Sequence, residues 1–155
     1  MGNNPFDKIV HLLKNKNVDF KILKHEPVYT SEQAAKVRDE PLKSGAKSLL
    51  LKTDEEFMLA VIPGSKRLDS YKLKKIVSVK RLRFASSEEV EQIMGCMIGA
   101  CYPIGDIIGI KTVVDKSLLE NEFISFNPGV HDQTIKIKSS DLKKVANIEL
   151  VDILE

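Results

Sequence analysis

The pattern of apolar and polar residues predicts helices in five segments of the chain. Residues 5–16 carry apolar side chains at helical spacing, and Pro5 suits a first helical turn. Capping sequences of the form Ser/Thr-x-x-Glu/Gln are predicted to begin two further helices, at Thr30 and at Ser86. The expected helices are 5–16, 30–37, 68–77, 86–94 and a short last one that begins at 140–142.

Six strands are predicted, over residues 18–23, 47–52, 57–62, 107–114, 123–126 and 134–138. The second and third are expected to form a hairpin, because a polar turn at 54–56 separates them and Pro63-Gly64 ends the pair. Strands and helices do not alternate regularly, which argues against a doubly wound parallel sheet. We expect an α+β fold, with a mixed, curled, barrel-like sheet surrounded by helices.

Length and charge set broad limits on the function. The 155 residues fit one domain, 1–155, and the net charge of +2 neither requires nor excludes a nucleic-acid partner. A basic cluster is either a contact for tRNA phosphates or a solvated helix face: Lys72, Lys74, Lys75, Lys80, Arg81 and Arg83. No apolar run reaches the roughly 18 residues that span a membrane, and no secretory signal is recognisable. We therefore expect a cytoplasmic protein without a membrane partner.

Three features carry candidate chemistry. The first is the turn 99–103, Gly-Ala-Cys-Tyr-Pro, whose backbone N–H groups could polarise a carbonyl group. The second is Lys47, a cation at the start of an apolar strand that can hold a phosphate as a point charge. The third is His131, which follows the turn 127–129 and can transfer a proton near neutral pH.

Each feature also has a plainer interpretation. Lys47 has the pattern of a lysine at a strand edge that extends into water, and Lys52 is the alternative cation on the same strand. Asp132 rivals His131 for the same role. The two cysteines are expected to be small buried residues, although Cys101 lies in the turn and could contact substrate. Neither a catalytic triad nor a metal-ligand spacing is recognisable, so no metal and no cofactor are expected.

Short motifs in a fixed order resemble the YbaK/ProX family of aminoacyl-tRNA deacylases, which includes the editing domain of bacterial prolyl-tRNA synthetases. Each motif is short, and the resemblance depends on their order and spacing from His25 to Leu142. The motifs are His25-Glu26-Pro27-Val28-Tyr29-Thr30, Gly45-Ala46-Lys47-Ser48, Pro63-Gly64-Ser65-Lys66-Arg67-Leu68-Asp69, Arg83-Phe84-Ala85-Ser86, Gly99 to Pro103, Val113 to Leu119 and Gly129-Val130-His131.

The resemblance implies the same mixed fold and a trans-acting aminoacyl-tRNA deacylase, a hydrolase that cleaves the ester of a mischarged tRNA. It implies that Lys47 holds the 3′ end of the tRNA, that Gly99 lies in the loop that polarises the ester carbonyl, and that His131 orients water or substrate. The implied partners are aminoacyl-tRNA and, in addition, a synthetase. The residues expected to bind substrate are His25, Tyr29, Ala100, Cys101, Tyr102, Pro103 and Gly129.

The alternative function is a non-catalytic module on the same fold that binds tRNA or a synthetase. The amino acid that is removed stays open at this point, with alanine, cysteine and serine as candidates. Met97, Ile98, Cys101 and Tyr102 are the residues expected to shape that choice. Without a triad or metal site, the family resemblance implies that the ribose hydroxyl, or in one branch a substrate thiol, assists hydrolysis.

Overall fold

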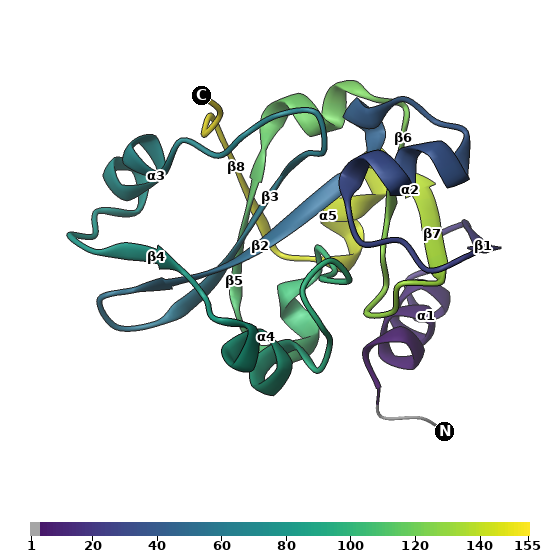
Figure 1. The fold of residues 1–155 in the computed structure, drawn as a ribbon, viewed down its shortest axis with the longest axis horizontal. Helices are drawn as coiled ribbons and strands as arrows, with labels where there is room; N and C mark the ends of the chain where they lie inside the picture. The colour runs from purple at the N-terminus through teal and green to yellow at the C-terminus, as the bar shows by residue number, and fades with distance from the viewer. Residues whose placement is uncertain (1–3) are drawn as a thin grey trace.

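A computed structural model describes residues 4–155, which form two β-sheets with helices around them (Figure 1). The three-stranded sheet is antiparallel, in the order β1 (Phe20–Lys24), β7 (Gln133–Lys138), β6 (Phe123–Phe126). The five-stranded sheet is mixed, in the order β4 (Leu82–Phe84), β2 (Ala46–Thr53), β3 (Phe57–Pro63), β5 (Lys111–Asp115), β8 (Ile148–Val151). Within it, β2 is antiparallel to β3 and β4, whereas β5 is parallel to β3 and β8.

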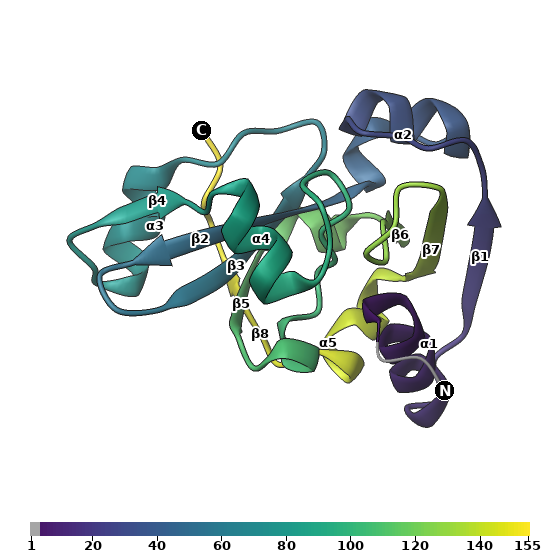
Figure 2. The ribbon, with the colours of Figure 1, turned by 60° about the horizontal axis from the view of Figure 1, so that its bottom comes forward.

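The helices are α1 (Pro5–Asn15), α2 (Ser31–Arg38), α3 (Ser70–Val77), α4 (Ser87–Met94) and α5 (Leu142–Val145). Four 3-10 turns connect elements: η1 (Leu42–Ser44), η2 (Gly105–Ile108), η3 (Lys116–Glu120) and η4 (Ser139–Asp141). Strands β6 and β7 lie between α2 and α1 (Figure 2). Between residues 4 and 155, no helix combines the length and the apolarity that crossing a membrane requires.

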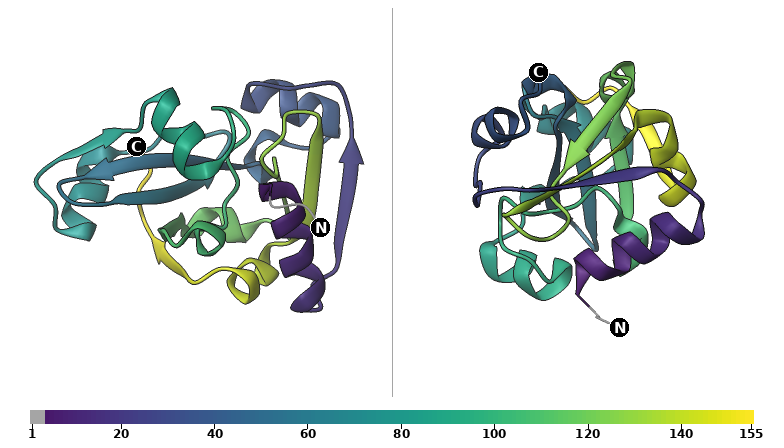
Figure 3. Two further views of the ribbon diagram at one scale, coloured as in Figure 1. Left: turned by 90° about the horizontal axis from the view of Figure 1, so that it is seen from below. Right: turned by 90° about the vertical axis from the view of Figure 1, so that its right-hand side faces the viewer.

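The α+β class is confirmed, but the sheet does not close into a barrel. An isolated bridge between Gly45 and Ser125 joins the two sheets at the start of β2. Beyond it, the β2–β3 hairpin extends away from the three-stranded sheet (Figure 3). In place of the one curled sheet that was predicted, the structure has two separate sheets that meet at one corner.

Strand β3 is the centre of the core, and its apolar run is continuous because both of its faces are covered. Leu59 and Val61 join the larger apolar cluster, with Ile9 of α1 and Val90 of α4. The neighbouring positions Met58, Ala60 and Ile62 join a second cluster with Leu73 of α3. Successive side chains of a strand point to opposite faces, so the two clusters lie on opposite sides of the sheet.

The helix starts follow the predicted caps with one difference. Ser86 and Glu89 form the complete capping box, in which each side chain accepts from the other residue's N–H. The Thr30 side chain accepts from the N–H of Gln33 as expected, but Gln33 reaches back to the N–H of Tyr29. That bond ties Tyr29 to the first turn of α2 and so fixes the residue at the helix entrance.

The predicted strand over 107–114 is correct only in its second half. Residues 105–108 form η2, and Gly109 follows with a φ of 70°, a conformation that ends the turn. The turn is stable because the Gly105 N–H donates to Thr112 Oγ1 and the Ile110 N–H donates to the Gly105 carbonyl. Two short strands, β4 and β8, were not predicted from the pattern.

Candidate active site

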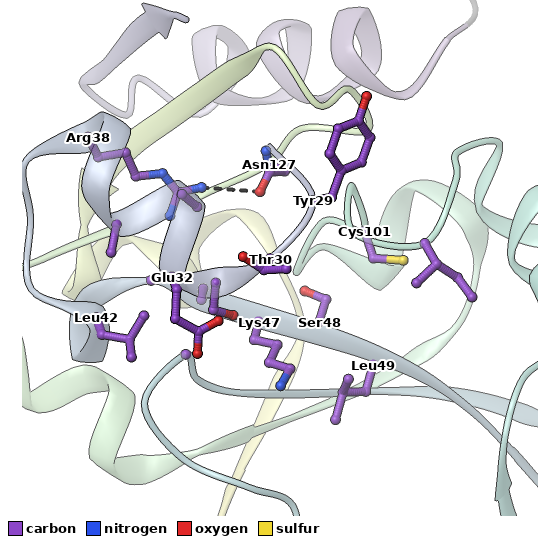
Figure 4. Close-up of a pocket in the computed structure, with 18 of the residues that line it drawn as sticks. Tyr29, Thr30, Glu32, Arg38, Leu42, Lys47, Ser48, Leu49, Cys101 and Asn127 are labelled. Atoms are coloured by element: carbon purple, nitrogen blue, oxygen red, sulfur yellow. Dashed lines mark hydrogen bonds between the residues drawn. The ribbon is translucent and has the colours of Figure 1, made fainter. Parts of the chain in front are cut away.

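A pocket of about 580 Å³ opens at the start of β2, between α2 and the loop that follows α4 (Figure 4). Its size falls in the range of pockets that hold small ligands. The N-terminal residues of α2, the first half of β2 and the segment 98–101 form its walls. It is lined by Tyr29, Thr30, Ser31, Glu32, Ala34, Ala35, Arg38, Glu40, Pro41, Leu42, Gly45, Ala46, Lys47, Ser48, Leu49, Leu50, Gly64, Phe84, Ala85, Val90, Ile98, Gly99, Cys101 and Asn127.

The pocket lies along an edge of β2 that carries no partner strand. On one side β3 pairs with Ala46–Lys52, whereas on the other side β4 pairs only with Leu51–Thr53. The Leu50 carbonyl accepts from the Ala85 N–H on this second side. Backbone groups of alternate residues face the same neighbour in an antiparallel pair, so those of Ser48 also point toward the pocket edge.

Lys47 and Ser48 extend to opposite sides of β2 (Figure 4). Lys47 is exposed, and within residues 4–155 its ammonium group forms neither an ion pair nor a hydrogen bond. Ser48 lies on the buried side with Ala46 and Leu50 as neighbours on the same face. The mouth of the pocket therefore carries a free cation, and its floor carries a hydroxyl group.

The loop 98–101 forms one wall of the pocket. Ile98, Gly99 and Cys101 line the cavity, whereas Ala100 is fully buried behind them. Of these four residues, only Ala100 has an N–H that donates within the described chain, to the Met97 carbonyl. Within residues 4–155, the N–H groups of Ile98, Gly99 and Cys101 donate to no acceptor. Unpaired backbone donors beside a cavity are the kind of group that can stabilise the oxyanion formed when an ester is hydrolysed.

Gly99 is required by the conformation of this loop, which gives it a φ of 96°. A Cβ atom there would lie 3.1 Å from the Tyr29 carbonyl oxygen and 3.3 Å from His131 Nε2. A side chain at position 99 would therefore press against groups of the protein itself, in addition to any substrate that enters the pocket.

We expect Gly99→Ala to lower both stability and activity. The strained backbone and the contact with Tyr29 should reduce the free energy of unfolding by about 1–3 kcal/mol. The shift of the loop should also lower kcat in the fraction that stays folded, because the N–H donors move. Urea unfolding and single-turnover kinetics would measure the two effects, and a variant with wild-type kcat would assign Gly99 a purely structural role.

His131 supports the loop from behind. Its Nε2–H donates to the Ile98 carbonyl at 3.1 Å, and its ring lies 4.6 Å from the ring of Tyr29. The His131 carbonyl also accepts from the Val28 N–H. His131 is not among the residues that line the pocket, so the structure places it where it holds Tyr29 and the loop in position.

Other residues that the resemblance pointed to lie near the pocket without lining it. Ala100 and Tyr102 are fully buried, and the Tyr102 hydroxyl donates to the Met94 carbonyl at 2.7 Å. Pro103 is also buried, and the Gly129 N–H donates to the Ala100 carbonyl. These residues set the shape of the loop, whereas Tyr29 and Cys101 reach the cavity itself.

His25 belongs to a chain of hydrogen bonds that begins at Arg38. The Arg38 Nε–H donates to Thr134 Oγ1 at 2.9 Å, and Thr134 Oγ1 lies 2.8 Å from His25 Nε2. His25 Nδ1 donates to the Glu26 carbonyl, so in the neutral ring Nε2 accepts from the threonine hydroxyl. His25 thus connects β1 to β7. The backbone N–H of His25 also donates to the Asp132 carbonyl.

Arg38 is a pocket residue that sequence reasoning missed. A second bond from its guanidinium reaches Asn127 Oδ1 at 3.2 Å (Figure 4). Burial lowers the pKa of Arg38 to about 10, with Glu40 acting in the opposite direction, so the group stays charged at neutral pH. The sequence offered a weak signal, an arginine at the end of a short helix before Asp39, which is also typical of exposed arginines.

The two thiols lie close together, with Cys96 Sγ and Cys101 Sγ 4.0 Å apart. Cys96 is buried as expected, and Cys101 is half-buried and lines the pocket. Their hydrogen bond, assisted by burial, raises the pKa of Cys96, and the same bond lowers the pKa of Cys101. No group of three His, Cys, Asp or Glu side chains within residues 4–155 is placed to hold a metal ion.

We expect Cys101→Ala to retain hydrolysis and to change the preference among amino acids. The thiol forms part of the wall, and a change of this size in a pocket alters discrimination by roughly 10-fold. Deacylation rates with alanyl-, seryl- and cysteinyl-tRNA would measure it. Complete loss of turnover, with Cys96→Ala still active, would instead indicate a cysteine nucleophile.

The basic cluster of residues 72–83 is partly occupied by contacts within the protein. Lys72 donates to the Leu154 carbonyl, Lys75 lies 4.4 Å from the Tyr71 ring, and Arg83 pairs with Glu89 at 2.7 Å. The α3 part of the cluster lies at the far end of the five-stranded sheet from α2 (Figure 1). A contact between this cluster and tRNA stays a prediction.

Comparison with known proteins identifies the family of the chain. The family model described as "Aminoacyl-tRNA editing domain" matches residues 25–145. The chain belongs to this family. It is 30% identical over 156 residues to the "Multifunctional Ser/Thr-tRNA deacylase ProXp-y" of Escherichia coli strain K12, covering 97% of this chain and 93% of the relative. The family predicted from the sequence motifs is thereby confirmed.

Further editing-domain relatives cover most of the chain. The "Prolyl-tRNA editing protein ProX" of Acetoanaerobium sticklandii is 23% identical, over 88% of this chain and 87% of the relative. A crystal structure of a candidate trans-editing enzyme for prolyl-tRNA synthetase superposes with a TM-score of 0.87 at 21% identity, covering 100% of this chain and 99% of the other. That likeness shows that the fold is the one found in this editing domain.

Proposed function

We propose that this editing domain is a trans-acting deacylase that hydrolyses seryl-tRNA and, by the same chemistry, threonyl-tRNA. The activity is that of a hydrolase of the aminoacyl ester, as the sequence motifs predicted and as its relatives are named. The choice of serine is supported by the 30% identical relative named as a Ser/Thr-tRNA deacylase, which the chain covers almost completely. The observation that carries the proposal is a pocket lined by Gly99, Cys101 and Lys47. Within residues 4–155, the N–H groups of Gly99 and Cys101 donate to no acceptor and Lys47 forms no ion pair.

The geometry suits hydrolysis by water. Attack of water on the ester carbon produces a tetrahedral oxyanion, which the free N–H groups of Gly99 and Cys101 stabilise. The attacking water gives up a proton, the bond between the ester carbon and the ribose oxygen breaks, and the ribose oxygen takes up a proton as it leaves. The neighbouring ribose hydroxyl relays that proton, because it lies next to the bond that breaks.

Lys47 binds the negatively charged backbone at the 3′ end of the tRNA. The side chain is exposed beside the pocket, and an ammonium group attracts a phosphate without a fixed geometry. Tyr29, 60% exposed on the opposite rim, offers its ring as a surface for the terminal base. His131 positions this ring through their contact.

The protein acts as one domain over residues 1–155, in the cytoplasm, with aminoacyl-tRNA as its partner.

The test of the proposed function is a panel of tRNAs charged with labelled serine, threonine, alanine, cysteine or the cognate amino acid. Release of free serine faster than spontaneous hydrolysis supports the proposal. Binding of every tRNA without faster release of any amino acid would establish the non-catalytic module instead.

A further inference from the structure

The floor of the pocket carries a hydroxyl group that has no hydrogen-bond partner in the described part of the chain. Ser48 is 8% exposed, and its Oγ atom forms no hydrogen bond within residues 4–155. A buried hydroxyl without a partner is unfavourable, and native proteins rarely retain one. Such a group in the wall of a cavity is explained by a ligand that supplies the missing bond.

The surroundings of Ser48 show which part of a substrate would meet it. Ala46 and Leu50, its neighbours on the same face of β2, are apolar and also line the pocket. The hydroxyl is directed to the side of the strand where Thr30 and Cys101 lie, whereas Lys47 extends to the opposite side (Figure 4). If Lys47 holds the tRNA backbone, the end of the substrate that reaches Ser48 is the aminoacyl group.

From this placement we infer that Ser48 is the residue that selects hydroxyl-bearing amino acids. Its Oγ exchanges a hydrogen bond with the side-chain hydroxyl of a bound seryl or threonyl group, and an alanyl group leaves Oγ unpaired. When a buried polar group of a site forms a hydrogen bond with one substrate, the site discriminates against an analogue that cannot form that bond. This inference rests on the proposed function and adds the residue that determines its specificity.

The test compares Ser48→Ala with wild type on one tRNA body charged either with serine or with alanine. The expected result is a fall of roughly 3- to 10-fold in the ratio of kcat/KM for the seryl ester to kcat/KM for the alanyl ester, the effect of one neutral hydrogen bond. Ser48→Cys, which nearly preserves the volume, should lower the ratio as well. The thermal midpoint of Ser48→Ala should equal or exceed that of wild type, because no native bond is lost.

The matched control is Ser44→Ala. Ser44 is buried to the same degree near the start of β2, but its Oγ donates to the Pro41 carbonyl and it does not line the pocket. Its substitution should lower the thermal midpoint and leave the seryl-to-alanyl ratio unchanged.

The outcomes separate the two proposals. Wild-type protein that leaves seryl-tRNA intact refutes the proposed function before Ser48 is tested. If wild type hydrolyses seryl-tRNA and Ser48→Ala lowers both rates equally, the role of Ser48 is refuted and the proposed function stands. A fall in the thermal midpoint of Ser48→Ala equal to that of Ser44→Ala would also overturn the inference, since it would show a structural bond.

Discussion

Replacing Lys47 with alanine is expected to lower kcat/KM for seryl-tRNA by roughly 10- to 150-fold, the effect of one lost hydrogen bond to a charged group. The side chain is exposed at the pocket mouth and forms no ion pair within residues 4–155, so its removal should leave the fold intact. The loss should appear mainly in KM and should shrink as salt is raised, because bound phosphates release counterions. Steady-state kinetics at two salt concentrations would measure it.

Lys52→Ala is the control for this prediction. Lys52 lies on the same strand, but its ammonium group lies 5.1 Å from the Phe57 ring and it does not line the pocket. Its kcat/KM should stay close to that of wild type at both salt concentrations. Equal losses in the two variants would show that the general positive charge of β2, rather than a local contact of Lys47, attracts the tRNA.

The parts of the fold that could be predicted from the sequence are those with local causes. The β2–β3 hairpin is specified by two apolar runs on either side of a charged turn, and α4 by its own capping box. Strand β4 has no such signal, because its three residues become a strand through pairing with the distant segment Leu51–Thr53. Three of the four residues from Ile107 to Ile110 are β-branched isoleucines, which suit a strand, but the Gly105 hydrogen bonds impose a turn.

The residues of the candidate site also differ in whether a local pattern in the sequence marks them. Lys47 and the loop at Gly99 are recognisable because a lone cation and a glycine turn stand out from their neighbours. No sequence pattern marks Ser48 or Arg38, because their roles depend on the residues that the fold places around them. Ser48 matters because its hydroxyl lacks a partner within residues 4–155, and Arg38 because β7 and the β6–β7 loop supply partners from almost a hundred residues away.

His131→Ala is expected to lower kcat by about 10-fold or more, because it removes the bond that holds the Ile98 carbonyl and the ring that supports Tyr29. The sequence motif suggested that this histidine orients water or transfers a proton, a role that typically contributes about 100-fold or more. Its Nε2 is instead engaged with the backbone of the loop, and the residue does not line the pocket. We therefore expect a positioning effect rather than the loss of a catalytic base.

His131→Gln distinguishes the two roles, because its amide N–H can donate to the Ile98 carbonyl but cannot act as a base near neutral pH. Recovery of much of the lost kcat in this variant, with a pH–rate profile that matches wild type, would support the positioning role. If the glutamine variant were as inactive as the alanine variant, His131 would be the base that the motif suggested. The Gly99 loop would then have to move far enough to bring the imidazole to the substrate, since the present contact turns Nε2 toward Ile98.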